Sequence, residues 1–273
     1  MTLASCDSRK TAGENPFFTE WDTPHGVPPF DKILPEHFMP AFERGMSLHE
    51  AEIDAITSNK DEATFENTIL AYDNAGQMLA QTELVFGMLC AAETNDRMQA
   101  LQEQAMPLLA AHRDKIRLDD KLFVRVKEVY DRRAALGLDA EQMRLLQKTY
   151  DSFVRAGALL DAEQKARLKE INGQLSLTAV KFGNNILAEN NNFVLELKSD
   201  ELDGLPAGIR DAAREKAQQM GKGDKWVFTL HKPSLIPLLT YSTKRDLREK
   251  IYKAYLNRCN NGDEYDNKQL IND

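Results

Sequence analysis

The sequence predicts a mainly α-helical protein that contains one small β-sheet. Apolar residues recur at helical spacing through most of the chain, and helix-capping patterns precede several of these stretches. Only two segments, 193–197 and 226–230, alternate in the manner of strands, and we expect them to pair. We therefore expect a multi-helix domain with long antiparallel helical hairpins and a two- or few-stranded sheet.

The composition is that of a soluble globular protein. Of 273 residues, 42% are hydrophobic and 29% are charged, so the chain can bury a large core. The net charge is −8, and the 35 basic residues form no block. Nucleic acid and anionic membrane surfaces are therefore poor candidates for partners. No apolar run approaches the roughly 18–20 residues that a membrane-spanning helix needs.

The N-terminus leaves two interpretations open. The tetrapeptide Leu3-Ala4-Ser5-Cys6 resembles a bacterial lipobox, but the basic and apolar regions that should precede it are missing. Either Met1 is internal to a longer precursor and Cys6 is lipidated in the cell envelope, or the match is accidental and the protein is cytoplasmic. We expect residues 1–14 to form a disordered tether or a processed N-terminus, followed by one helical region over 15–273.

The first elements follow from proline, aromatic and capping residues. Residues 15–35 are rich in proline and aromatic side chains, which predicts an irregular arm packed across the helices. Helical periodicity covers 35–56. Thr64 is the expected N-cap of a single further helix whose apolar positions run over 65–86.

Two more helices are expected in the middle of the chain. Residues 95–116 have helical periodicity, and Pro107 should kink or divide the helix. The next helix has Asp119 as its N-cap and is expected to end at Gly137.

Two capping boxes then mark the starts of two helices. Asp139 with Gln142, and Asp161 with Gln164, each place an acceptor at the N-cap and an amide three residues later. Each such cap contributes about 1 kcal/mol. If the second helix continues to Ala188, it is roughly 40 Å long. The short link between them predicts an antiparallel hairpin.

The C-terminal part of the chain is predicted to combine the two strands with helices. A helix near 207–220 separates the strands, and a turn or short helix is expected at 233–237. Thr243 should open an amphipathic helix over 244–258. Another helix begins near 266, and the sequence ends within two turns of it. Because domains seldom end one turn into an uncapped helix, we expect the chain to be the N-terminal part of a larger protein.

The histidines and cysteines do not form a recognisable metal site. His49-Glu50-Ala51-Glu52-Ile53 begins like the zinc motif H-E-x-x-H, but Ile53 occupies the position of the second histidine. Since a catalytic zinc needs about three protein ligands, we expect His49 to lie on a solvated helix face. His112 falls on an apolar stripe and is expected to be a hydrogen-bonded core residue. Cys90 and Cys259 belong to no C-x-x-C pair.

Other polar clusters are expected to be structural. Gly221-Lys222-Gly223 lacks the spacing of a phosphate-binding loop and is predicted to form a turn. The asparagines at 184–185 and 190–192 are interpreted as turn or helix-end residues, and Glu50 and Glu52 as surface charges. Packing and a buried ion pair, rather than ligand binding, are the preferred account of Tyr252, Tyr255 and Arg258. No catalytic or metal-binding residue is assigned, and substrate-binding residues stay unassigned.

A series of short motifs, each weak alone, carries more information through its order along the chain. The motifs lie at 15–18 (Asn-Pro-Phe-Phe), 28–33, 36–37, 40–46 (Pro-Ala-Phe-Glu-Arg-Gly-Met), 64–69 (Thr-Phe-Glu-Asn-Thr-Ile), 94–96, 122–126, 153–158, 245–249, 252–258 and 266–267. In this order they resemble the N-terminal half of the thimet oligopeptidase and neurolysin group of zinc metallopeptidases. Within that group the chain is most similar to the bacterial peptidyl-dipeptidase branch and then to oligopeptidase A.

The resemblance implies a mainly helical protein divided by a deep channel, with the N-terminal region forming one wall and a lid. In that family the other half carries H-E-x-x-H and a downstream glutamate, which hold zinc and activate water. The implied substrates are short unstructured peptides, from which the peptidyl-dipeptidase branch releases C-terminal dipeptides. The zinc motif does not occur in this sequence, so no catalytic residue can be transferred and the chain alone is expected to be inactive and to bind no catalytic zinc.

Two alternatives to an enzyme segment are a stand-alone helical adaptor, including an inactive relative, and a lipid-anchored helical surface protein. The last rests on Cys6 alone. If the chain is a segment, we expect surface that meets the missing C-terminal catalytic region to be exposed or repacked, which favours a non-physiological dimer.

Overall fold

The computed structural model describes residues 14–273, so the lipobox at Cys6 and nearly all of the expected tether lie outside the described residues. The chain divides into two compact units, with the boundary between Leu177 and Thr178. The fold is mainly helical with one two-stranded antiparallel sheet, as the sequence predicts.

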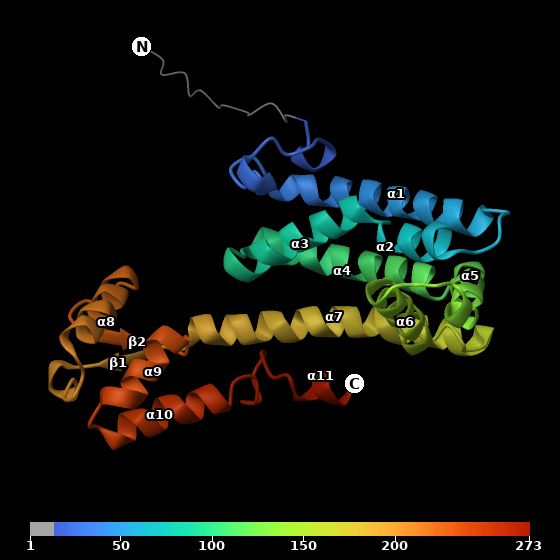
Figure 1. Ribbon diagram of the computed structural model, residues 1–273. Helices are drawn as coiled ribbons and strands as arrows, with labels where there is room; N and C mark the ends of the chain where they lie inside the picture. The colour runs from blue at the N-terminus through green and yellow to red at the C-terminus, as the bar shows by residue number, and fades with distance from the viewer. Residues whose placement is uncertain (1–13) are drawn as a thin grey trace, which may run out of the picture. The chain divides into compact units, whose positions relative to one another are not determined.

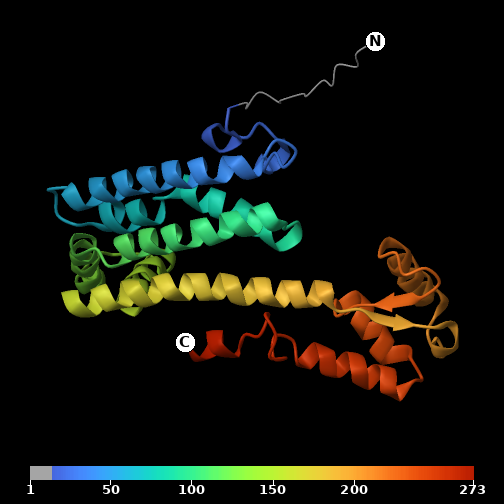
Figure 2. The same cartoon turned by 180° about the vertical axis from the view of Figure 1, so that it is seen from behind.

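Three long helices form the framework of the first unit: α1 (Phe38–Ser58), α3 (Gln77–Ala92) and α4 (Asp96–Arg117). Figure 1 shows α3 running back along α1 and α4 running back along α3, and the view from behind in Figure 2 shows the same layers. α1 packs against both α3 and α4, and of these two helices α3 runs antiparallel to α1 (Figure 1).

The arm before α1 is irregular, as expected. It contains three short 3₁₀ turns, η1 (Pro16–Phe18), η2 (Pro24–Gly26) and η3 (Pro35–His37). Phe17 is buried, with its ring 5.4 Å from that of Phe38 and 6.0 Å from that of Trp21. These aromatic contacts attach the arm to the first helix of the framework.

The expected single helix after Thr64 is broken. Thr64 is the N-cap, but it starts a π-helical segment, η4 (Phe65–Leu70), which is followed by one turn of α2 (Ala71–Asp73). Gly76 then adopts a left-handed conformation with φ 74°, and α3 starts at the next residue. A left-handed residue cannot continue a right-handed helix, so apolar periodicity alone missed this break.

The next helix boundaries differ from the predictions at two points. α4 has Asn95 as its N-cap, at the start of the expected helical stretch, and continues through Pro107, which does not divide it. Asp119 caps α5 (Asp120–Asp131), whose Leu122 N–H donates to the Asp119 carboxylate. The helix ends before Gly137 because a 3₁₀ turn at Arg133–Ala135 intervenes.

Both predicted capping boxes are present. Asp139 and Gln142 exchange hydrogen bonds at the start of α6 (Ala140–Arg155), and Asp161 and Gln164 do so at the start of α7 (Ala162–Asn192). However, α6 packs mainly against α5 and η4, so the expected antiparallel hairpin of the two capped helices is not the main packing contact of α6.

The second unit contains the sheet. β1 (Leu195–Leu197) pairs antiparallel with β2 (Trp226–Phe228), and α8 (Ala207–Gln219) packs on β2. Gly221 and Gly223 form the predicted turn between them, both with positive φ. The unit continues with α9 (Lys232–Tyr241), α10 (Arg245–Leu256) and α11 (Lys268–Asn272).

Thr243 does not cap α10, contrary to the prediction. Its hydroxyl instead donates to the Asp203 carboxylate at 2.6 Å, and Lys244 occupies the N-cap position without a side-chain hydrogen bond. The bond to Asp203, which is distant in sequence, replaces the expected capping bond to the helix backbone. Capping patterns contain no information about such distant partners.

Polar side chains on the C-terminal half of α7 bind the segment after α10. Glu189 accepts hydrogen bonds from the Cys259 backbone N–H and from the Asn261 side chain, while Asn190 accepts one from Arg258 at 3.1 Å. The asparagines at 190–192 are the last residues of α7, as expected of helix-end residues, whereas those at 184–185 lie inside the helix and do not form a turn. Arg258 stacks on Tyr255, 3.9 Å from the ring centroid, and the expected buried ion pair is replaced by this contact and the Asn190 bond.

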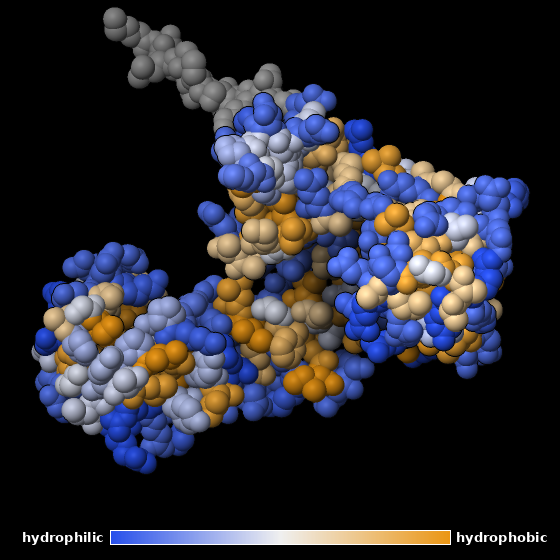
Figure 3. Space-filling model, viewed as in Figure 1, coloured by the Kyte–Doolittle hydropathy of each residue, from blue (hydrophilic) through white to orange (hydrophobic). Residues whose placement is uncertain are grey.

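Apolar side chains are exposed on the surface of both units. Leu84, Met88, Leu108 and Leu175 are among them in the first unit. Figure 3 shows apolar patches along α7 and over parts of α3 and α4. Within residues 14–273, none of the helices has the length and apolar character required to span a bilayer.

Candidate functional site

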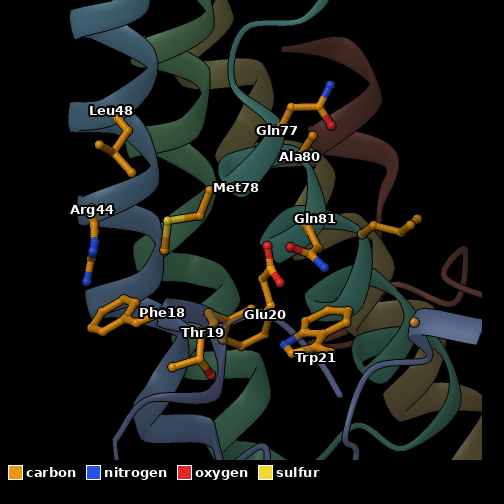
Figure 4. Close-up of a pocket in the computed structure, with 13 residues that line it drawn as sticks. Phe18, Thr19, Glu20, Trp21, Arg44, Leu48, Gln77, Met78, Ala80 and Gln81 are labelled. Atoms are coloured by element: carbon orange, nitrogen blue, oxygen red, sulfur yellow. The ribbon is translucent and has the colours of Figure 1, made fainter. Parts of the chain in front are cut away.

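Two neighbouring cavities in the first unit are the strongest candidates for a site. The larger has a volume of about 770 Å³ and lies between the N-terminal arm, α1 and α3. Figure 4 shows Phe18 and Trp21 of the arm on one side, Arg44 and Leu48 of α1 on another, and Met78 of α3 facing them. The Arg44 guanidinium lies over the Phe18 ring, 4.5 Å from its centroid.

The smaller cavity, of about 480 Å³, is the one lined by His49 and His112. Both cavities fall within the volume range of small-molecule and peptide-side-chain sites. Ala80 and Leu84 of α3 contribute to both linings. The remaining residues that line the smaller cavity are His49, Tyr72, Ala75, Gly76, Leu79, Glu83, His112, Arg113, Ile116 and Arg117.

A pair of histidines joins two helices at this cavity. His49 Nδ1 of α1 and His112 Nε2 of α4 are 3.0 Å apart, within hydrogen-bonding distance. His112 is 5% exposed and His49 is half-buried. His112 Nδ1, on the far side of its ring, lies 3.5 Å from a carboxylate oxygen of Glu50.

The surroundings determine which nitrogen carries the proton. A Glu50 carboxylate facing His112 Nδ1 favours the tautomer with hydrogen on that atom, which leaves Nε2 as an acceptor. His49 Nδ1–H then donates to His112 Nε2. The 3.5 Å separation is too long for a good hydrogen bond, and His112 Nδ1 has no closer partner.

Burial is the main reason that the pKa of both imidazoles is lowered. It lowers the pKa of His112, which nearby Lys115 and Arg113 lower further while Glu50 opposes them. Burial also lowers the pKa of His49, and the charge that His112 can carry adds to this effect. The pKa of Glu50 is lowered, chiefly by its hydrogen bond with Lys115.

The start of α3 completes the surroundings of His49. A Cβ at Gly76 would lie 2.9 Å from His49 Nδ1, so the glycine lets the α3 N-terminus approach the ring. The Gly76 backbone N–H donates to the Glu52 carboxylate at 2.7 Å. The positive end of a helix disfavours a positive charge nearby, which also favours the neutral form of His49.

These positions correct part of the sequence interpretation. His49 does not lie on a solvated helix face, because its ring is bonded to His112. Glu52 is exposed and Glu50 partly exposed, as expected of surface charges, and each also has a partner, Gly76 N–H for Glu52 and Lys115 for Glu50. The prediction that His112 is a hydrogen-bonded core residue is confirmed. Sequence offered no signal for the pair, whose members are 63 residues apart.

The donor set of the described residues does not fit a catalytic zinc ion. Over residues 14–273 there is no group of three or more His, Cys, Asp or Glu side chains placed to hold a metal. His231 contacts Thr229, and His37 accepts from the Leu34 N–H, so both are occupied locally.

Comparison with known proteins identifies relatives over nearly the whole chain. No family model matches it. It is 36% identical over 258 residues to dipeptidyl carboxypeptidase of Escherichia coli (strain K12), covering 94% of this chain and 38% of that protein. The corresponding protein of Salmonella typhimurium is 34% identical over the same share of both chains. Oligopeptidase A of E. coli is 25% identical over 254 residues, which is 91% of this chain and 37% of that protein.

The chain therefore spans less than two-fifths of the length of these relatives. The similarity is spread over both structural units, since the matched 258 residues exceed either unit alone. The chain is thus a homologue of dipeptidyl carboxypeptidase over 94% of its length and of oligopeptidase A over 91%, and it spans 38% and 37% of those two proteins.

Proposed function

We propose that this chain is the helical, non-catalytic N-terminal part of a zinc-dependent peptidase that releases dipeptides from the C-termini of short peptides. The observation that carries the proposal is the 36% identity to dipeptidyl carboxypeptidase over 94% of the chain. The share of that relative left unmatched is large enough to hold a separate catalytic region. The alternative branch, oligopeptidase A, has lower identity.

Zinc, when bound by the complete protein, supplies a Lewis acid for the peptide carbonyl and an activated water. Its ligands are proposed to lie in polypeptide beyond the present sequence, because the described residues contain no suitable donor cluster. The role of this chain is then to form a wall beside the reacting peptide and to exclude folded proteins by steric hindrance.

The first unit has suitable surface for such a wall. Its larger cavity combines apolar side chains, including Trp21 and Met78, with hydrogen-bonding groups such as Gln81. This mixture accommodates peptides of varied sequence, since apolar surface binds side chains without strict geometry and polar groups bind backbone. The exposed apolar residues on α3 and α4 are proposed to meet peptide or the remaining polypeptide, and a dimer is expected when neither is present.

Cellular location is proposed to depend on Cys6. Lipidation would place the protein in the bacterial cell envelope, and an unmodified Cys6 behind an intact Met1 would place it in the cytoplasm. Mass spectrometry of the N-terminal peptide, purified from the native host, distinguishes the two.

The complete gene product provides the test of function. We expect it to contain about one zinc per polypeptide and to release dipeptides from a short peptide with a free C-terminus, as measured by mass spectrometry. A chelator should abolish release and added zinc should restore it. A complete product that binds peptide without cleaving it would instead support the adaptor.

A further inference from the structure

We propose that His49 and His112 form a pH-sensitive latch between α1 and α4, which is closed while the imidazoles share a hydrogen bond and opens when both are charged. The latch borders the 480 Å³ cavity, so its opening changes the shape of that cavity. This inference does not depend on the proposed peptidase function, because it concerns only contacts within the first unit.

The hydrogen bond between the rings sets the limit on protonation. His49 Nδ1 and His112 Nε2 are 3.0 Å apart, and the bond needs a hydrogen on one nitrogen and a lone pair on the other. A first added proton leaves this arrangement intact if it binds the outer nitrogen of His49. A second proton places hydrogens on both facing nitrogens, so the bond is replaced by repulsion between two cations.

The acidic groups around the pair already have partners. Glu50 binds Lys115 at 2.8 Å, Glu83 binds Arg113 at 3.2 Å, and Glu52 accepts the Gly76 N–H. The titratable and charged groups that face the pair from the surrounding elements are Glu50 and Glu52 of α1, Tyr72 of α2, Glu83 of α3, and Arg113, Lys115 and Arg117 of α4.

These surrounding groups cannot neutralise the charge of a second imidazolium. Its three carboxylates are offset by three cationic side chains on α4, and the N-terminus of α3 adds partial positive charge beside His49. A doubly protonated pair must therefore separate or gain water. Because His112 is almost completely buried, solvation requires α1 and α4 to move apart locally.

The Gly76 amide provides a local reporter of this opening. The amide donates to Glu52, and the α-carbon of Gly76 lies beside the His49 ring, so the amide chemical shift responds to movement of either side chain. In two-dimensional NMR spectra of the 273-residue chain, we expect the Gly76 resonance and both histidine rings to change together as the pH falls from 7.5 to 5.0. A His112→Asn variant should lose the joint transition, and His231→Asn in the second unit should keep it.

Two substitutions at partly exposed positions distinguish charge effects from structural damage. Glu50→Gln removes the carboxylate that favours charged His112, so the midpoint should move to lower pH. Lys115→Gln removes a cation that disfavours charged His112, so the midpoint of the joint NMR transition should move to higher pH. Shifts in opposite directions support the latch. Shifts of the midpoint in the same direction overturn the latch, and so does a Gly76 resonance that is insensitive to pH in the unsubstituted chain. Both of these measurements can be made even if His112→Asn fails to fold.

Discussion

Gly76 and His49 are in such close contact that a methyl group on the glycine α-carbon would lie 2.9 Å from the imidazole Nδ1. Gly76 also has φ 74°, a conformation that is unfavourable for residues with a side chain. One glycine therefore occupies the N-cap position of α3 and leaves room for the histidine pair.

Replacement of this glycine should be costly. We predict that Gly76→Ala destabilises the chain by about 1–3 kcal/mol, since both left-handed strain and the clash with His49 oppose it. Urea unfolding measures the change. Gly173→Ala is a matched control, because Gly173 is helical with nothing within 4 Å of a Cβ, and it should be neutral or slightly stabilising. Equal effects of the two substitutions would contradict this account.

Stability should fall as the pH decreases through the range in which histidine titrates. Burial lowers the folded-state pKa of His49 and His112 below 6.5, so the unfolded chain binds more protons just below that pH. Their contribution to stability is complete above about pH 6.5 and is lost as the pH falls toward their folded-state values. Thermal melts between pH 7.5 and 5.0 should show this decline, and it should be weaker in His112→Asn.

The Glu50 contribution lies in a different pH range. Its lowered pKa means that its stabilising effect is lost only as the pH falls below about 4.5, so it does not account for a decline near pH 6. A melting temperature that is constant from pH 7.5 to 5.0 would contradict the predicted histidine contribution.

Arg125 is a buried connector whose removal should weaken the first unit. Only 9% exposed, it donates to the backbone oxygens of Asn59 and Asp61 and to the Asn67 side chain. We predict that Arg125→Met costs about 2–4 kcal/mol in the free energy of unfolding, because these acceptors lose charged donors. Arg97→Met removes an exposed ion pair with Glu36 and should have no measurable effect.

In the second unit, Glu189 should control the order of the segment that follows α10. Replacement by Gln leaves an amide that cannot accept at both oxygens from Cys259 and Asn261. We predict faster amide hydrogen exchange over residues 258–267 in Glu189→Gln, with little change in β1 and β2. Uniform acceleration across the unit would indicate global destabilisation instead of local release.

Local sequence signals predicted most of the helices because their causes are local. The capping residues Thr64, Asn95, Asp119 and Asp139 accept backbone hydrogen bonds within three residues, so the pattern alone is sufficient. The two strands were also predictable, because both segments alternate in the manner of strands and a clear helix separates them.

The features that sequence missed depend on contacts between distant residues. Thr243 was predicted to cap a helix, but Asp203, 40 residues away, takes its hydroxyl. The His49–His112 contact likewise requires α1 and α4 to be adjacent, which neither helix encodes alone. No periodicity or spacing rule includes such pairs, so the candidate site could be found only from the three-dimensional structure.

The central claim is that the chain is structural support for a peptidase whose catalytic residues it does not contain. The most direct test incubates purified 1–273 with zinc and a short peptide bearing a free C-terminus, and measures dipeptides by mass spectrometry beside the complete gene product. We predict chelator-sensitive dipeptide release by the complete product and none by the chain alone. Dipeptide release by 1–273 that a chelator abolishes would contradict the claim.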